Sequence, residues 1–286
     1  MKRKRRNKYP FIILLIIHTS LLVGTFLKKK DKKTLFVLLI SNMGFAYLFE
    51  YFVLNILQAY KYKPKILKKN YFDNILGAIL SQAFYIPFTA VFLSAFHIKW
   101  LGKSLFVLYF FLVEQLFRNL KVYKTKWWSP VNTSFLLPVY FKLSDKWYEY
   151  LQKSNPIVFF ITLFLSIMGT GVNLIYLGAV TGSFRFGSGR IHKWKEHFVY
   201  APLYSIFLSI IKAFFIRKDG WIVKVSILIF DMCTDRFLFK IGLVKKNFQI
   251  PFLNVLFHGA MIGMSEFYKR LIYKGVKEEN EKESVT

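Results

Sequence analysis

The sequence predicts an all-α polytopic membrane protein: a helical bundle of about nine spans, with two parallel four-helix repeats after an N-terminal anchor helix. Three observations support this prediction. First, 55% of the 286 residues are hydrophobic and 20% are charged, whereas soluble domains are about 45–50% apolar and about 25% charged. Second, the apolar residues form runs of about 20, the length that crosses a roughly 30 Å hydrocarbon core as a helix. Third, motifs of the first half recur in order in the second half.

The composition also excludes several classes of protein. The high apolar content excludes a disordered or collagen-like chain. The single cysteine, Cys233, rules out an intramolecular disulfide and a Cys-based metal site. The net charge of +27 comes from short Lys/Arg clusters between apolar runs. No soluble domain presents these clusters to nucleic acid, so we expect no nucleic-acid partner and expect the basic loops to contact anionic lipid head groups.

Nine apolar segments are candidate spans. The first follows the basic sequence KRKRR; it has no small-residue cleavage site, so an uncleaved anchor is favoured over a signal peptide. The fifth is the weakest, because Pro138 interrupts its short apolar part; a re-entrant or interfacial helix is the alternative. The nine segments are residues 10–27, 34–58, 74–97, 104–120, 132–150, 156–182, 197–216, 221–240 and 250–273.

The distribution of positive charge predicts the orientation. Lys and Arg favour cytoplasmic loops. With a cytoplasmic N-terminus, the inside loops between the second and ninth spans carry 15 Lys or Arg residues, and the outside loops carry six. The lysines of 28–33 and the basic C-terminal end oppose this arrangement. We therefore expect a multi-pass protein of the cell membrane with its N-terminus in the cytoplasm.

An internal repeat organises the chain. Tyr85-x-Pro87 and Tyr200-x-Pro202 are each followed, after four residues, by Phe-Leu-Ser. Further matches keep a constant spacing of 121 residues, among them Glu114 with Asp235. The predicted parts are a basic N-terminus with the anchor helix (1–33), two four-helix units (34–151 and 156–273) and a charged tail (274–286). Four spans per unit make the repeats parallel, as in some transporters whose sites lie between the halves; repeats also occur in proteins that transport nothing.

Acidic residues within the spans form the candidate intramembrane polar site. Such groups are costly in a bilayer and usually face the bundle interior. Glu50 lies in the second span, and Glu114 precedes Arg118 by one helical turn in the fourth. Asp231 and Asp235 lie one turn apart in the eighth, so they could share a proton or a cation. The alternative is structural: these groups extend to the head groups from helix ends.

Two prolines interrupt helices at matching depth. Pro87 and Pro202 each remove a backbone donor and predict a kink, with Tyr85 and Tyr200 beside them. A break that coordinates a ligand is the alternative. The histidines lack the HExxH spacing of zinc hydrolases, and the chain has no phosphate-binding glycine loop. The counterpart of His258 in the predicted repeat is Leu137, so the repeat does not support a paired role for this histidine. We therefore expect no catalytic residues, no metal and no cofactor.

Several aromatic features of the first unit occur together. They are Tyr85-Ile86-Pro87, then Glu114-x-x-Phe117, Tyr123, the Trp127-Trp128 pair and Lys146-Trp147-Tyr148. In these features the unit resembles a group of small four-helix integral membrane proteins of spore-forming Gram-positive bacteria that have no assigned activity. The second unit departs from the pattern, since Phe248-Gln249 replaces the Trp pair. The resemblance implies a fold and a membrane location, and it supplies no catalytic residues.

Three functions remain open. The first is transport or channel activity for a small solute or ion through the repeat interface, favoured by the repeat and the acidic residues at depth. The second is a non-catalytic membrane component that binds lipid or a partner protein. The third is a lipid-modifying enzyme that uses His192, His197 and Asp235. Exchanging Glu114 and Asp235 for neutral residues should alter flux only in the first case.

Overall fold

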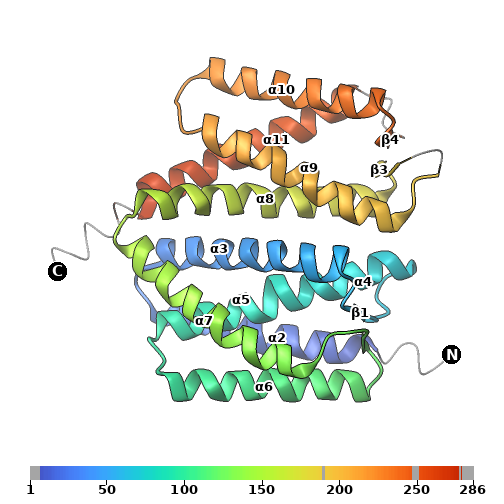
Figure 1. Cartoon of the computed structure of the whole chain (residues 1–286). Coiled ribbons are helices and arrows are strands. Elements are labelled where there is room, and N and C mark those ends of the chain that lie inside the picture. Colours follow the sequence, from blue (N-terminus) through green and yellow to red (C-terminus); the bar gives the residue numbers. More distant parts are fainter. Residues whose placement is uncertain (1–6, 189–190, 247–250, 277, 279–286) are drawn as a thin grey trace. The chain divides into compact units, whose positions relative to one another are not determined.

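The computed structural model describes residues 7–188, 191–246, 251–276 and 278. The chain divides into two compact units, Met1–Lys153 and Ser154–Thr286 (Figure 1). Within the described residues each unit consists of long helices and one short two-stranded antiparallel ribbon. The predicted all-α class is confirmed; the ribbons, which the sequence analysis did not predict, are three residues long in each strand.

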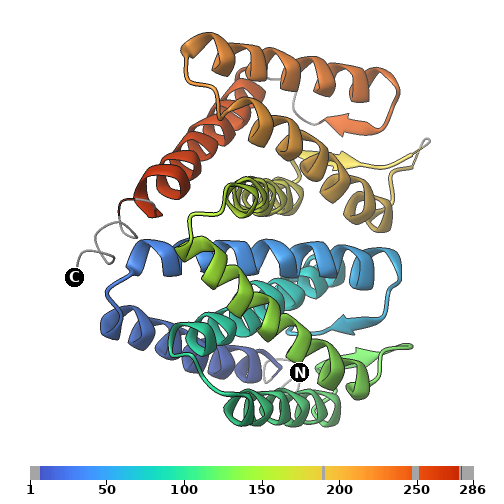
Figure 2. The same cartoon turned by 60° about the vertical axis from the view of Figure 1, so that its left-hand side comes forward.

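The first unit begins with α2, which the sequence places apart as an anchor. Its remaining helices alternate in direction, and the last, α7, crosses the others obliquely (Figures 1 and 2). The elements are α2 (Lys8–Lys28), α3 (Lys32–Glu50) with the π-helical turn η1 (Tyr51–Ile56), β1 (Tyr60–Tyr62), α4 (Asn70–Ile79), the π-helical turn η2 (Leu80–Tyr85), α5 (Ile86–Ala95), α6 (Trp100–Asn119), β2 (Tyr123–Thr125) and α7 (Pro130–Gln152).

The second unit has a similar order of long helices and strands, without a counterpart of α2 in the described chain and with the single helix α9 where the first unit has α4, η2 and α5. Its elements are α8 (Pro156–Thr181), β3 (Phe184–Phe186), α9 (Trp194–Phe215), α10 (Trp221–Lys240), β4 (Val244–Lys246), α11 (Pro251–Arg270) and the π-helical turn η3 (Leu271–Val276). Local sequence sets the ends of α8: the Asn155 side chain accepts from the backbone N–H groups of Ile157 and Val158 at 3.0 and 3.2 Å, and Pro156 fits the first turn. Gly182, with φ of 80°, ends the helix.

Each ribbon joins the loop after α3 or α8 to the loop before the unit's last long helix, α7 or α11. Tyr62 faces Tyr123 in the first ribbon, and Phe186 faces Val244 in the second. Each ribbon lies at one end of its own unit's helices (Figure 2). The hydrogen bonds between the two strands therefore hold neighbouring helix ends together. The hydrogen bonds within each helix could not do this.

Helix α2 is part of the first unit's core. The Phe11 ring stacks on that of Phe117, with centroids 4.8 Å apart, and the Tyr85 hydroxyl donates to the Phe11 carbonyl at 2.7 Å. In the second unit, α8 and α9 approach closely where Gly171 faces Ser205, whose hydroxyl donates to the carbonyl of Met168 at 3.1 Å. Small residues commonly permit such contacts between membrane helices.

Six helical segments in the described chain are long and apolar enough to cross a membrane. They are Lys8–Lys28, Lys32–Ile56, Asn70–Ala95, Trp100–Asn119, Pro156–Thr181 and Trp194–Phe215. They correspond to six of the nine predicted spans. The helices α7, α10 and α11 have 23, 20 and 20 residues but are not among these six. Their assignment as spans therefore stays a prediction.

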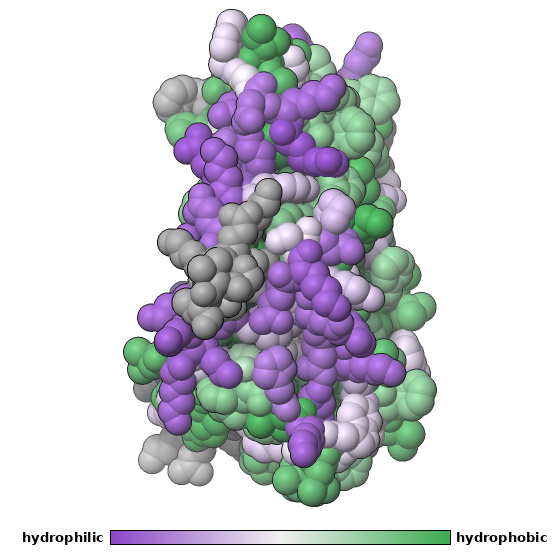
Figure 3. All heavy atoms as spheres, turned by 90° about the vertical axis from the view of Figure 1, so that its left-hand side faces the viewer, coloured by the Kyte–Doolittle hydropathy of each residue, from purple (hydrophilic) through white to green (hydrophobic). Residues whose placement is uncertain are grey.

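The outer helix faces are apolar. On α6 the exposed leucines recur every three or four residues and form one face: Leu101, Leu105, Leu108, Leu112 and Leu116. Figure 3 shows hydrophilic side chains gathered at helix ends, with hydrophobic side chains along the flanks of each unit. Continuous apolar faces of this kind are rare on soluble proteins and suit contact with lipid. The helices and their surfaces thus indicate a membrane protein.

Replacing Gly77 by alanine should destabilise the first unit. A methyl group at Gly77 would overlap the Cβ of Tyr62 on β1, and overpacking typically costs about 1–3 kcal/mol. Gly24→Ala is the matched control, since nothing lies within 4 Å of its added methyl group and alanine is the better helix former. Thermal unfolding in detergent, followed by circular dichroism, should show a lower Tm for Gly77→Ala only. Equal Tm values would contradict this contact.

Candidate functional site

A buried ionic network links α9, α10 and α11 in the second unit. Lys212 Nζ of α9 lies 2.6 Å from Asp231 Oδ2 of α10. Both residues are at most 1% exposed, as is His258 of α11. Charges buried this deeply are normally paired, because removing each ion from water costs several kcal/mol. The ion pair therefore fixes how far α9 and α10 are shifted along each other.

His258 bridges the two aspartates that the sequence places one turn apart. Its Nδ1 lies 3.2 Å from Asp231 Oδ2, and its Nε2 lies 3.2 Å from Asp235 Oδ2. The imidazole thus reaches a carboxylate from each of its nitrogens. A histidine in this position can hold a proton on either side or on both. The sequence pattern does not point to His258 as a site residue, because its counterpart in the predicted repeat is Leu137.

Asp235, one turn along α10 from Asp231, accepts hydrogen bonds from two neutral donors. The Tyr204 hydroxyl of α9 donates to its Oδ1 at 2.5 Å, and the Asn254 amide of α11 donates to its Oδ2 at 3.2 Å. Lys212 can balance the charge of one carboxylate only. One further proton makes the network neutral, and it can reside on His258 or on Asp235. This arrangement can bind and pass on a single proton.

A second ionic group lies farther along the same helices. Glu266 Oε2 of α11 lies 3.5 Å from Lys224 Nζ of α10 and 3.1 Å from Lys269 Nζ. Lys269 also contacts the exposed Asp219 at 2.6 Å, and this ammonium group lowers the pKa of the Asp219 carboxyl. Lys224 precedes Asp231 by seven residues, which is two helical turns or about 10 Å. Ionisable groups thus recur along the α10–α11 contact, from the exposed Asp219 to the buried network.

The first unit holds a cavity of about 300 Å³ in place of an ionic network. Half of its lining residues are aromatic, and Glu114 of α6 also lines it. The Thr133 hydroxyl of α7 donates to Glu114 Oε2 at 2.6 Å, whereas Glu114 Oε1 has no hydrogen-bond partner. A volume of this order suits a small ligand.

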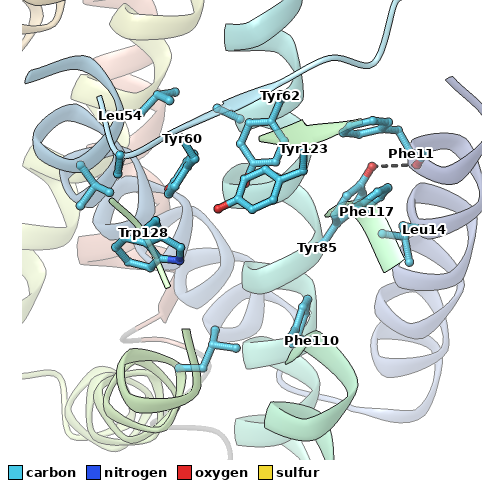
Figure 4. Packing of buried hydrophobic residues seen from close by; sticks show 14 of the residues in the cluster. Phe11, Leu14, Leu54, Tyr60, Tyr62, Tyr85, Phe110, Phe117, Tyr123 and Trp128 are labelled. Carbon is cyan, nitrogen blue, oxygen red and sulfur yellow. Dashed lines mark hydrogen bonds between the residues drawn. The ribbon is translucent and has the colours of Figure 1, made fainter. Parts of the chain in front are cut away.

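The ribbon supplies one wall of this cavity. The Tyr60 ring packs 5.4 Å from Trp128 and 5.2 Å from Tyr123, centroid to centroid (Figure 4). Burial, and then the charge of Glu50, raises the pKa of Tyr60 and of Tyr62 well above the ordinary value. These phenols therefore stay neutral hydrogen-bond donors, and the Tyr60 hydroxyl donates to Glu50 Oε1.

The structure places the predicted acidic residues in two separate surroundings. Asp231 and Asp235 lie in one network. Glu50 and Glu114 belong to the cavity region of the first unit, where Tyr60 stands between Glu50 and the cavity. Arg118 is exposed and forms no ion pair with Glu114 in the described chain. The spacing between Glu114 and Arg118 thus did not predict the partner of this carboxylate, which is Thr133 of α7.

The two Tyr-x-Pro motifs also lie in different surroundings. Pro87 follows the π-helical turn η2, and the Tyr85 hydroxyl bonds to α2 instead of its own helix. Pro202 is buried inside α9, and Tyr200 packs against the small apolar cluster beside the second ribbon. Pro87 has no backbone N–H to donate, and the π-helical turn before it accommodates this loss.

Equivalent contacts recur in both units at the spacing of 121 residues. Glu114 accepts from Thr133 at 2.6 Å, and Asp235 accepts from Asn254 at 3.2 Å. A second pair of contacts follows the same spacing. Lys103 pairs with Asp145, and Lys224 lies 3.5 Å from Glu266. The helix pairs α6–α7 and α10–α11 are thus joined at the same two positions.

His192 and His197 brace the second ribbon. The ring nitrogens of His192 lie 3.1 and 3.0 Å from the carbonyl oxygens of Arg185 and Gly242. His197 Nδ1 accepts from the backbone N–H of Phe186 at 3.1 Å. These contacts give both residues a structural role. No cluster of metal-ligating residues able to hold an ion occurs within the described ranges.

Comparison of the chain with models of known protein families, with curated proteins and with solved structures gave no match.

Replacing Asp231 by asparagine should strongly destabilise the second unit. It leaves Lys212 buried without its counter-charge, which typically costs about 3–5 kcal/mol. The double variant Lys212→Met/Asp231→Asn removes the uncompensated charge and should recover much of the loss. Chemical unfolding in detergent measures both variants in a double-mutant cycle. Additive losses in the double variant would show that the two side chains do not interact.

Proposed function

We propose that the chain is a multi-pass membrane transporter or channel for a small solute or ion, driven or gated by proton binding. The observation that carries this proposal is the buried chain Lys212–Asp231–His258–Asp235. Ionisable residues within membrane helices are rare, and they commonly form proton relays or substrate pathways. A purely structural role needs one ion pair, whereas this network has a second carboxylate and a bridging histidine.

We also propose that α7, α10 and α11 cross the membrane. The charged residues that lower the apolarity of α10 include Asp231, which is fully buried. The side of α10 that faces outward carries large apolar residues, which are Ile222, Val225, Ile229 and Phe237. A helix with polar groups inside and apolar groups outside suits lipid in spite of a modest mean hydropathy. Nine spans, with both ribbons on the cytoplasmic side, follow from this assignment and from the basic inside loops.

A duplication accounts for the framework that the two units share. The order of elements, the ribbon registers and the two contacts spaced by 121 residues all recur. Within this frame the acid of α6 and the acid of α10 are equivalents. The earlier expectation of a path between the repeats is thereby refined, because the proposed proton path lies inside the second unit.

The alternative function is a non-catalytic membrane component that binds lipid or a partner protein. The basic loops support it, since Lys and Arg near the surface attract anionic head groups. The structural roles of His192 and His197 argue against a lipid-modifying enzyme built on those residues. The two remaining functions differ in one measurable property, which is flux.

Proton flux should depend on His258. In liposomes with the purified protein, an imposed potassium diffusion potential should drive proton entry above that of empty liposomes, measured with a trapped pH dye. His258→Leu introduces the residue found 121 positions earlier, Leu137, and it removes the bridge between the carboxylates. We expect flux to fall at least tenfold. Asp235→Asn should have a similar effect.

Glu149→Gln is the control for this experiment. Glu149 is an exposed carboxylate of α7 that pairs with Lys146 and Lys153, and such pairs contribute little. Its flux should equal that of the unchanged protein. If the protein gives no flux above empty liposomes under several imposed gradients, the ion-coupled function is wrong and the lipid- or partner-binding component is favoured.

A further inference from the structure

The aromatic cavity of the first unit carries a second inference, which goes beyond proton transport and does not depend on it. Among the described residues that line the cavity, Glu114 is the only one with a charged side chain. The chain has 42 Lys and Arg residues, yet the described lining contains none of them. The cavity therefore has the opposite electrostatic character from the chain as a whole.

Glu114 has one carboxylate oxygen that a ligand can contact. It is 9% exposed, and its Oε1 atom has no hydrogen-bond partner while Thr133 holds Oε2. An unpaired carboxylate oxygen in such a place costs free energy unless a proton or a cation satisfies it. The carboxylate lines the cavity directly, so a bound cation would meet it there.

The rings around the carboxylate favour an organic cation over a metal ion. Phe49, Tyr60 and Trp128 pack edge to face, with centroids 6.0 Å apart for Phe49–Trp128 and 5.4 Å for Tyr60–Trp128. Aromatic faces attract quaternary ammonium groups, whereas a metal ion needs several oxygen or nitrogen ligands. Figure 4 shows Tyr60, Trp128 and Tyr123 around a common space.

Glu50 strengthens this attraction from behind the ring. It accepts a hydrogen bond from the Tyr60 hydroxyl, and its other oxygen, Oε2, has no partner. A phenol that donates its hydrogen to a carboxyl oxygen has a more electron-rich ring, which increases its attraction for a cation. Both acids thus favour a cation in the cavity: Glu114 contacts it directly, and Glu50 acts through Tyr60.

We propose that this cavity binds a small hydrophobic cation of the quaternary ammonium type, held by Glu114 and the rings of Tyr60 and Trp128. A choline-type lipid head group and a free organic cation share this chemistry. The proposal stands if proton flux fails, because binding in the first unit is measured without a gradient.

The test compares two ligands of the same shape. Equilibrium dialysis in maltoside micelles measures binding of labelled benzyltrimethylammonium and of neopentylbenzene, its neutral carbon analogue, with protein-free micelles as the blank. We expect the cation to bind the unchanged protein at least tenfold more tightly than the neutral analogue. Equal affinity would overturn the proposal and leave an apolar cavity without charge selectivity.

Three variants locate the site. Glu114→Gln should weaken cation binding at least tenfold, and Trp128→Leu should weaken it several-fold, with little change for the neutral analogue. Glu149→Gln, an exposed carboxylate at the far end of α7, should bind as the unchanged protein does. Cation binding that survives Glu114→Gln in full would overturn the proposal; if that variant fails to fold, Trp128→Leu and the ligand comparison decide. Displacement by short-chain phosphatidylcholine and not by phosphatidylglycerol would identify a lipid head group as the source.

Discussion

The burial of Lys212 against Asp231 constrains the second unit more than any other interaction. An isolated ammonium group in this position would be very costly, so α9 and α10 must meet where the two charges touch. Once they do, Asp235 lies one turn away on α10, and α11 places His258 and Asn254 against it. The positions of the three helices therefore follow from one requirement of charge balance, and the proton relay proposed above uses the same groups.

The first unit solves the same packing problem with aromatic rings. Phe110 precedes Asp231 by the 121 residues of the predicted repeat, and it is buried beside His18 of α2, with ring centroids 5.7 Å apart. An apolar residue there removes the need for a buried lysine. Rings are bulky and rigid, so they leave space where their edges meet, and this space is the cavity that Glu114 lines. The added helix α2 contributes Phe11 to its wall.

The sequence predicts the long apolar helices but not the contacts between them. Apolar runs predict spans because hydrophobic length is a local property. The ribbons escaped prediction because three residues are too few to show alternation. Glu114 was recognised from its depth, but its partner Thr133 lies on another helix, and the local spacing pointed to Arg118 instead. His258 was set aside by comparison with Leu137, since that comparison assumes that the repeats kept the same chemistry. The cavity depends on tertiary packing and had no signal in the sequence.

Glu114 and Asp235, which the predicted repeat makes equivalent, have different surroundings in the two units. Glu114 and Asp235 each accept from the residue 19 positions later on the next long helix. Beyond that contact their neighbours differ. Tyr204 contacts one carboxylate oxygen of Asp235 and His258 contacts the other, so a proton can be shared between Asp235 and His258. Glu114 keeps one oxygen unpartnered among aromatic faces, so it can be satisfied from outside the protein. On the functions proposed here, the carboxylate is the part the units share, and the surrounding side chains determine whether it exchanges a proton or holds a cation.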